Sequence, residues 1–106
     1  MNPSVKMGVP RILCVEEDPA VRESQCAALQ SSGYHAFSAS PKLAEMILSC
    51  QPFDLIVLLT VDEYALNRII NVADRAEILS LEHLAMPSDM LRKVEEKLRH
   101  WRERRG

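Results

Sequence analysis

The chain has 106 residues and a formal net charge of −2, from 13 Lys and Arg against 15 Asp and Glu. This length fits one domain and leaves no room for a second. The slightly acidic balance gives no global electrostatic reason to bind nucleic acid or an anionic membrane. Hydrophobic residues make up 47% of the chain but aromatic residues only 5%, so the core must consist mainly of aliphatic side chains.

The cysteines and the N-terminal residues bear on the compartment. Cys14, Cys26 and Cys50 are odd in number and lack zinc-ligand spacing, so we expect buried, reduced thiols in a cytoplasmic protein. The first ten residues lack the apolar core of a signal peptide, and no apolar run reaches the ~20 residues of a membrane span. Residues 1–10 are predicted to be a flexible tail, and residues 11–106 a single domain.

Short apolar segments alternate with helical patterns along this domain. Arg11–Val15 is predicted to be the first strand. A helix follows, because Asp18 can cap it and Pro19 suits its first turn. We expect Gln25 on the solvent face of this helix, and Gly33 ends it.

A second strand is predicted at Tyr34–Ser38. Ser40 and Pro41 repeat the cap-then-proline signal, and the helix that they begin ends at Pro52. The next stretch, Phe53–Thr60, contains an apolar run with neither alternation nor a helical period. Such a run is typical of a strand buried on both faces at the centre of a parallel sheet.

The pattern then repeats twice more. A third helix is predicted from about Val61 to Asp74, with Thr60 and Glu63 at capping-box spacing. Glu77–Leu81 is predicted to be the fourth strand, and Pro87 opens the last helix. Four βα units in succession predict an α/β fold, with a parallel sheet, right-handed crossovers and helices on both faces.

The carboxyl ends of the strands are the expected place for function in such a sheet. After the central strand this place holds Leu59, Thr60 and Asp62, and Asp62 is interpreted as an acid of the first helical turn. After the first strand it holds Glu16 and Glu17, next to the helix cap. Clustered carboxylates can hold Mg²⁺, but composition alone favours a solvated acidic loop.

The C-terminal segment Lys97–Arg105 has five Lys or Arg against one Glu, with Trp101 among them. A basic patch of this kind can bind nucleic acid or an acidic partner. The plainer interpretation is a helix end whose cations complement the helix dipole, with Trp101 packed on the sheet. The three histidines lack ligand spacing, and the chain has no phosphate loop or nucleophile elbow, so we expect no enzyme.

Three segments resemble a response-regulator receiver domain (CheY-like) of two-component signalling. Ile12–Arg22 resembles its first strand, its acidic pair and a helix begun by Asp-Pro. Ser32–Tyr34 resembles its Gly-Tyr step into the second strand, and Gln51–Val57 resembles its third strand. The resemblance is close from Arg11 to about Leu58. It implies a flavodoxin-like three-layer sandwich, but receivers have five βα units and this chain has four.

The resemblance also implies what has become of the family's active site. The acidic pair that binds Mg²⁺ falls on Glu16 and Glu17, and the phosphoacceptor aspartate falls on Leu59, which has no nucleophilic atom. The lysine that precedes a proline falls on Met86, and Met86-Pro87 favours an alignment in which the family's fourth unit is the missing one. Under the other alignment the fifth unit is missing and Ser80 takes the place of the switch hydroxyl. The hydroxyl residue that acts as a switch in the family has no clear counterpart here, and Thr60 is interpreted as a vestige of that position. We therefore expect no Mg²⁺ at this site.

These observations lead to one hypothesis and two alternatives. The hypothesis is an atypical stand-alone receiver-like module that lacks the phosphoacceptor aspartate and acts by protein–protein interaction in a bacterial-type signalling pathway. The first alternative is a response regulator still phosphorylated in a phosphorelay, through Asp62 or Glu17. The second is a small nucleic-acid-binding module that uses the basic C-terminal helix.

If the family's fourth βα unit is missing from this chain, there is a consequence for assembly. The last strand then lies at the edge of the sheet, beside the central one, and its residues Ile78, Leu79 and Leu81 are apolar. Open apolar edges tend to pair or to be covered. We expect a homodimer through this strand or its flanking helices, with Trp101 among the contacts, or one formed by exchange of the last βα unit.

Overall fold

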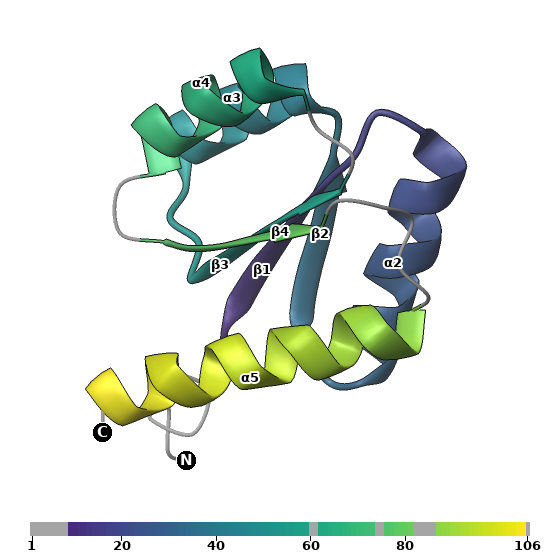
Figure 1. Cartoon of the computed structure of the whole chain (residues 1–106), viewed down its shortest axis with the longest axis vertical. Coiled ribbons are helices and arrows are strands. Elements are labelled where there is room, and N and C mark those ends of the chain that lie inside the picture. The colour runs from purple at the N-terminus through teal and green to yellow at the C-terminus, as the bar shows by residue number, and fades with distance from the viewer. Residues whose placement is uncertain (1–8, 60–61, 74–75, 82–86, 106) are drawn as a thin grey trace.

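The computed structural model describes residues 9–59, 62–73, 76–81 and 87–105, with side chains up to residue 99. Figure 1 shows a sheet between two layers of helices. In chain order the elements are β1 (Arg11–Val15), α2 (Pro19–Ser31), β2 (His35–Ala39), α3 (Pro41–Cys50), β3 (Leu55–Leu59), α4 (Glu63–Ala73), β4 (Glu77–Leu81) and α5 (Pro87–Arg105). The predicted α/β fold with four βα units is confirmed. None of the described helices has the length and apolar character that a membrane span requires.

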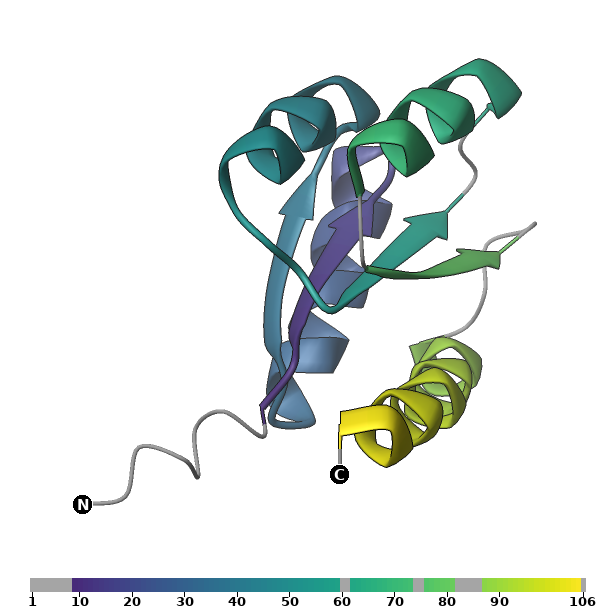
Figure 2. The same cartoon turned by 90° about the vertical axis from the view of Figure 1, so that its left-hand side faces the viewer.

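The sheet is parallel, with the strand order β2-β1-β3-β4. In Figure 2 the strands run from β2 on the left to β4 on the right, below α3 and α4. The other two helices, α2 and α5, pack against each other on the opposite face. Within the described residues β4 pairs only with β3, so it is an edge strand, as the sequence predicted.

All five residues of β3 are buried, which explains its uninterrupted apolar run. Leu55, Val57 and Leu59 belong to the core under α2 and α5. Ile56 and Leu58 belong to the separate core under α3 and α4. Because successive side chains of a strand face opposite sides, a strand covered on both sides needs apolar residues at every position.

The first two predicted helix starts are confirmed in detail. The Asp18 carboxylate accepts a hydrogen bond from the Ala20 N–H at 2.9 Å, and the Ser40 hydroxyl accepts one from the Leu43 N–H at 3.2 Å. Each side chain satisfies a backbone donor that the first helical turn leaves without an intrahelical partner. Gly33 has φ +95°, a left-handed conformation that favours glycine, directly after α2.

The start of α4 differs from the predicted capping box. The helix begins at Glu63, and the Asp62 carboxylate accepts a hydrogen bond from the Ala65 N–H at 2.8 Å. The Asp62 carbonyl oxygen also accepts one from the Leu66 N–H at 2.9 Å. Asp62 is therefore the residue that caps the helix, while Thr60 lies outside the described residues.

Three further expectations need correction. Gln25 is only 3% exposed, because α2 packs against α5 as well as against the sheet and so buries a wider face than its apolar residues indicate. Cys14 and Cys26 are buried as expected, but Cys50, the last residue of α3, is exposed. The second strand, β2, begins one residue later than predicted.

Asp54 joins the starts of three strands. Its carboxylate accepts a hydrogen bond from the Arg11 N–H at 2.8 Å, and its own N–H donates to the Arg11 carbonyl at 2.9 Å. Its carbonyl oxygen accepts from the Glu77 N–H at 2.9 Å. One residue therefore holds β1, β3 and β4 in alignment at their amino ends.

Asp54→Ala removes the charged acceptor of this arrangement and should lower the free energy of unfolding by about 2 kcal/mol. Asp54→Asn is the matched control, because it keeps an oxygen acceptor and should lose less than about half of that. Urea unfolding of both variants measures the difference. Equal losses would mean that the bond to the Arg11 N–H is not what Asp54 contributes.

Candidate functional site

The carboxyl ends of β1 and β3 lie side by side. Val15 of β1 is in register with Leu58 of β3, so the next residues, Glu16 and Leu59, are neighbours across the sheet. On its other side Leu59 is in register with Leu81 of β4. The structure thus places Leu59 between the first of the two sequence-predicted acids and an apolar edge strand.

Leu59 is a core residue. Its side chain is 0% exposed and belongs to the cluster under α2 and α5, together with Leu81 and Met90. An alkyl side chain has no atom that can attack phosphorus or ligate a metal ion. Leu59 itself therefore contributes packing and no nucleophile.

Glu16 is also buried, at 4% exposed, and it takes part in several hydrogen bonds. Its carboxylate Oε2 accepts a hydrogen bond from the Asp18 N–H at 3.0 Å. Its N–H donates to the Ala39 carbonyl at 3.2 Å, and its carbonyl accepts from the Arg22 guanidinium at 2.8 Å. These bonds hold the turn between β1 and α2 in place.

Glu17 lies in different surroundings from Glu16. It is exposed, and it lines a cavity of about 250 Å³ together with residues at the start of α3 and on α4: Pro41, Lys42, Glu45, Tyr64, Ala65 and Arg68. Arg68 spans this cavity, with an ion pair to Glu45 at 2.9 Å and a hydrogen bond to the Tyr64 hydroxyl at 3.1 Å. The two members of the acidic pair therefore do not share one environment.

Several predicted positions lie outside the described part of the chain. Thr60 and Met86 are not described, and neither is the side chain of Trp101. Of the basic segment, Lys97 is half-buried and Arg99 is exposed, so the nucleic-acid alternative stays a prediction. Among the residues whose side chains are described, no three His, Cys, Asp or Glu gather in a group that could hold a metal ion.

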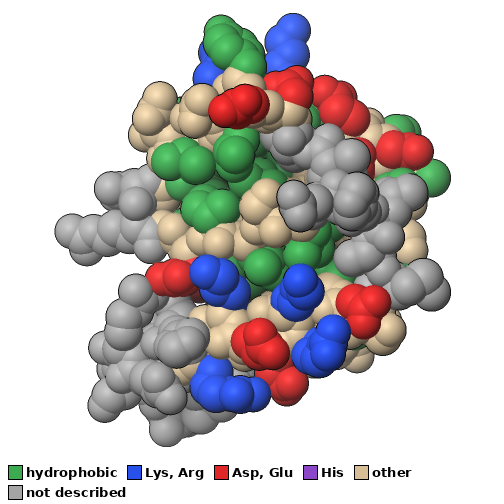
Figure 3. Space-filling view, in the orientation of Figure 1, with side chains coloured by type: hydrophobic (Ala, Val, Ile, Leu, Met, Phe, Trp, Pro, Cys, Tyr) green, Lys and Arg blue, Asp and Glu red, His purple; other side chains and the backbone are tan. Residues whose placement is uncertain are grey.

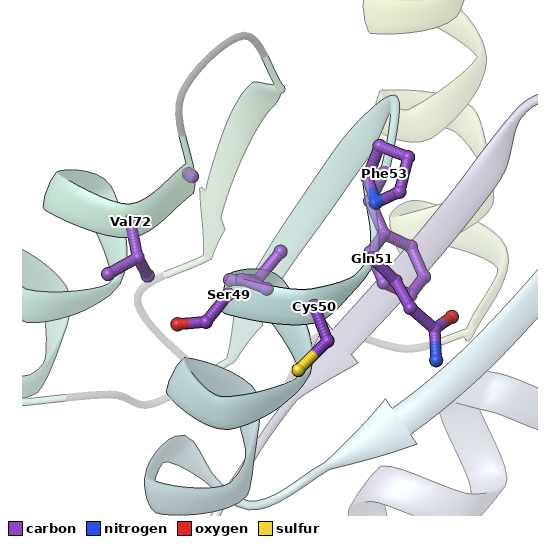
Figure 4. A pocket seen from close by; sticks show the side chains of 8 residues that line it. Ser49, Cys50, Gln51, Phe53 and Val72 are labelled. Carbon is purple, nitrogen blue, oxygen red and sulfur yellow. The ribbon is translucent and has the colours of Figure 1, made fainter.

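Sequence reasoning missed two further cavities, because each joins elements far apart in the chain. One, of about 320 Å³, lies at the amino end of β3. Figure 4 shows it between the end of α3, with Ser49 and Cys50, and Val72 of α4. The other, of about 340 Å³, is a groove between β4 and α5, lined by Leu79, Lys93, Glu96 and Lys97. No sequence signal marked either cavity, since single polar or apolar residues on separate helices carry no local pattern.

Comparisons with known proteins agree with the architecture. No family model matches this sequence, and no curated protein matches it. Among solved structures, the chain is similar to a response regulator receiver domain protein (CheY-like) from Methanospirillum hungatei JF-1, with a TM-score of 0.62 and 19% sequence identity. The alignment covers 92% of this chain and 99% of that one. The chain has the fold of a response-regulator receiver domain, with four parallel strands in its described part.

Proposed function

We propose that this chain is a receiver-like signalling module that acts by binding another protein, without aspartyl-phosphate chemistry or other catalysis. The observation that carries the proposal is Leu59. It occupies the carboxyl end of the central strand, next to Glu16, and it is fully buried among apolar side chains. Aspartyl phosphorylation needs a carboxylate that can attack phosphorus, and leucine offers none.

Two of the other acids at this end of the sheet, Glu16 and Asp62, already have structural contacts. The Glu16 carboxylate holds the Asp18 N–H, and the Asp62 carboxylate caps α4. A phosphoryl group on Asp62 could reach the acidic pair only if the first turn of α4 unwound, and that would give up the bond to the Ala65 N–H at a cost of about 1 kcal/mol. We therefore propose that the module binds no Mg²⁺ at this site and does not use Asp62 or Glu17 as a phosphoacceptor.

The interaction that replaces phosphorylation is the second part of the proposal. The receiver fold supports a partner protein in a signalling pathway of the two-component type, in the cytoplasm. Within the described residues the outer edge of β4 has no partner strand, and this supports self-association, since unpaired strand edges bind other strands readily. We propose that the module forms a homodimer through this edge.

A two-dimensional amide NMR titration tests the chemistry of the site. The ¹⁵N-labelled protein is titrated with Mg²⁺, and then with Mg²⁺ plus beryllofluoride as a phosphoryl mimic. We expect no saturable shift at the amides of Glu16, Glu17 and Asp62. Saturable shifts there would contradict the proposal and favour the phosphorelay alternative. Glu17→Gln and Asp62→Asn would then show which acid is used, because only one of them should abolish the shifts.

A further inference from the structure

We infer that two copies of the chain pair antiparallel through β4, with the two-fold axis at Leu79, so that the two sheets join into one. This inference rests on the proposed function, since it names the partner and geometry of the proposed interaction. It follows from the direction of the backbone groups on β4, from the symmetry of the register, and from the charges beside the edge.

The backbone directions on β4 are fixed by its pairing with β3. The Glu77 N–H donates to the Asp54 carbonyl, so the polar groups of Glu77 point toward β3. The N–H and C=O of one strand residue share an edge, and successive residues alternate between the two edges. The N–H and C=O groups of Leu79 and Leu81 therefore also point toward β3. Those of Ile78 and Ser80 point toward the outer edge of the sheet.

Only one symmetric antiparallel register pairs all of these groups within the described strand. If the axis passes through Leu79, Ile78 of each copy lies opposite Ser80 of the other, and each such pair exchanges two hydrogen bonds. An axis through Ile78 or Ser80 would pair one of these residues with a position outside Glu77–Leu81. The register centred on Leu79 thus satisfies both donors and both acceptors on each copy.

The side chains fit the same axis. A two-fold axis perpendicular to the sheet keeps each face of the sheet on its own side, so Leu79 meets Leu79 of the second copy on the face that α5 covers. Such a non-hydrogen-bonded pair brings its side chains close together. The groove between β4 and α5 opens at this point, and Leu79 forms part of its lining.

The groove carries both signs of charge. Lys93, Glu96 and Lys97 line it from α5. Figure 3 faces the β4 edge and shows acidic and basic side chains interspersed along α5, below a band of apolar side chains. In the symmetric pair the two α5 helices run antiparallel on the same face, and the inferred register brings the grooves of the two copies together, each with two lysines and Glu96. A groove that carries both signs of charge can pair with a second copy of itself, whereas a groove of one sign would repel its copy.

Ser80→Pro is the variant that tests the edge. Proline removes an N–H that points away from β3, and edge strands tolerate proline at such positions, so the fold should persist. The dimer should dissociate about 100-fold more readily, because two symmetry-related hydrogen bonds are lost. Ser80→Ala is the matched control: it keeps the N–H and should retain the dimer. Sedimentation equilibrium measures the affinity, and circular dichroism checks the fold.

A mixing experiment tests whether a second copy of the chain binds at the groove between β4 and α5. It remains informative even if the proline variant fails to fold. Glu96→Lys makes the groove wholly basic, and the double substitution Lys93→Glu with Lys97→Glu makes it wholly acidic. Each variant alone should dimerise about tenfold more weakly than the unmodified chain, and an equal mixture should recover the dimer.

Three outcomes would overturn the inference: a monomer at all concentrations, a dimer that Ser80→Pro does not weaken, or a mixture no tighter than its components. None of them would affect the NMR test of the site, so a failed dimer and a failed proposal for the site are distinguishable.

Discussion

Leu59→Asp is expected to lower the free energy of unfolding by about 4 kcal/mol. The substitution replaces a fully buried alkyl group with a carboxylate in the core under α2 and α5. A domain of this size has only about 5–15 kcal/mol of stability, so the variant should be partly unfolded at moderate denaturant. Urea unfolding followed by circular dichroism measures the loss.

Mg²⁺ separates the chemical effect of this substitution from its packing effect. The new carboxylate would lie beside Glu16, at the position to which the family resemblance assigns the phosphoacceptor. We expect Mg²⁺ to stabilise Leu59→Asp by about 1.4 kcal/mol at ten times its dissociation constant, through mass action. Leu59→Asn is the control, since it loses the same packing but adds no charge and should gain nothing from Mg²⁺. If Leu59→Asp is as stable as the unmodified chain, Leu59 does not lie in the core.

The second large effect is a loss of stability at alkaline pH. Cys14 is fully buried in β1, and this burial, together with the nearby Cys26, raises the pKa of its thiol to about 12. In the unfolded chain a thiol has a pKa of about 8.5. Above that pH the unfolded state releases a proton that the folded state retains. The free energy of unfolding should therefore fall by about 1.4 kcal/mol per pH unit, and by about 4 kcal/mol on approaching the folded-state pKa.

Denaturant unfolding between about pH 9 and 11 measures this slope, and Cys14→Ala is the comparison. The variant should be less stable at neutral pH, because it leaves a small cavity in the core. Its stability should nevertheless fall less steeply with pH than that of the unmodified chain. Burial also raises the pKa of Cys26, so part of the dependence should remain. Parallel slopes for the two proteins would contradict the role of Cys14.

The elements of the fold were predictable where a local pattern determines them. The apolar run of β3 predicts its uniform burial. The pairs Asp18-Pro19 and Ser40-Pro41 predict the starts of α2 and α3. Burial of Gln25 was not predictable, because it depends on the packing of α2 against α5. No pattern within one helix records which other helix will lie beside it.

The site shows the same division. The sequence and the family resemblance pointed to Leu59, which the structure places at the carboxyl end of the central strand, next to Glu16. They did not separate the two neighbouring glutamates, of which Glu16 turns inward to the Asp18 N–H while Glu17 lines a cavity with α3 and α4. That difference arises from tertiary contacts, and two adjacent identical residues carry no sequence signal to distinguish them.

The position of β4 at the edge of the sheet also sets the order in which the protein can be completed during synthesis. The strands β1, β2 and β3 come first along the chain and form a contiguous part of the sheet. Until residues 77–81 leave the ribosome, the open edge belongs to β3, whose five residues are all destined for burial. A nascent chain at that stage exposes the unpaired, apolar edge of β3 and is therefore more prone to aggregate than the complete domain. Addition of β4 covers the exposed edge of β3. A chain truncated before residue 77 would leave that edge exposed and should be prone to aggregate.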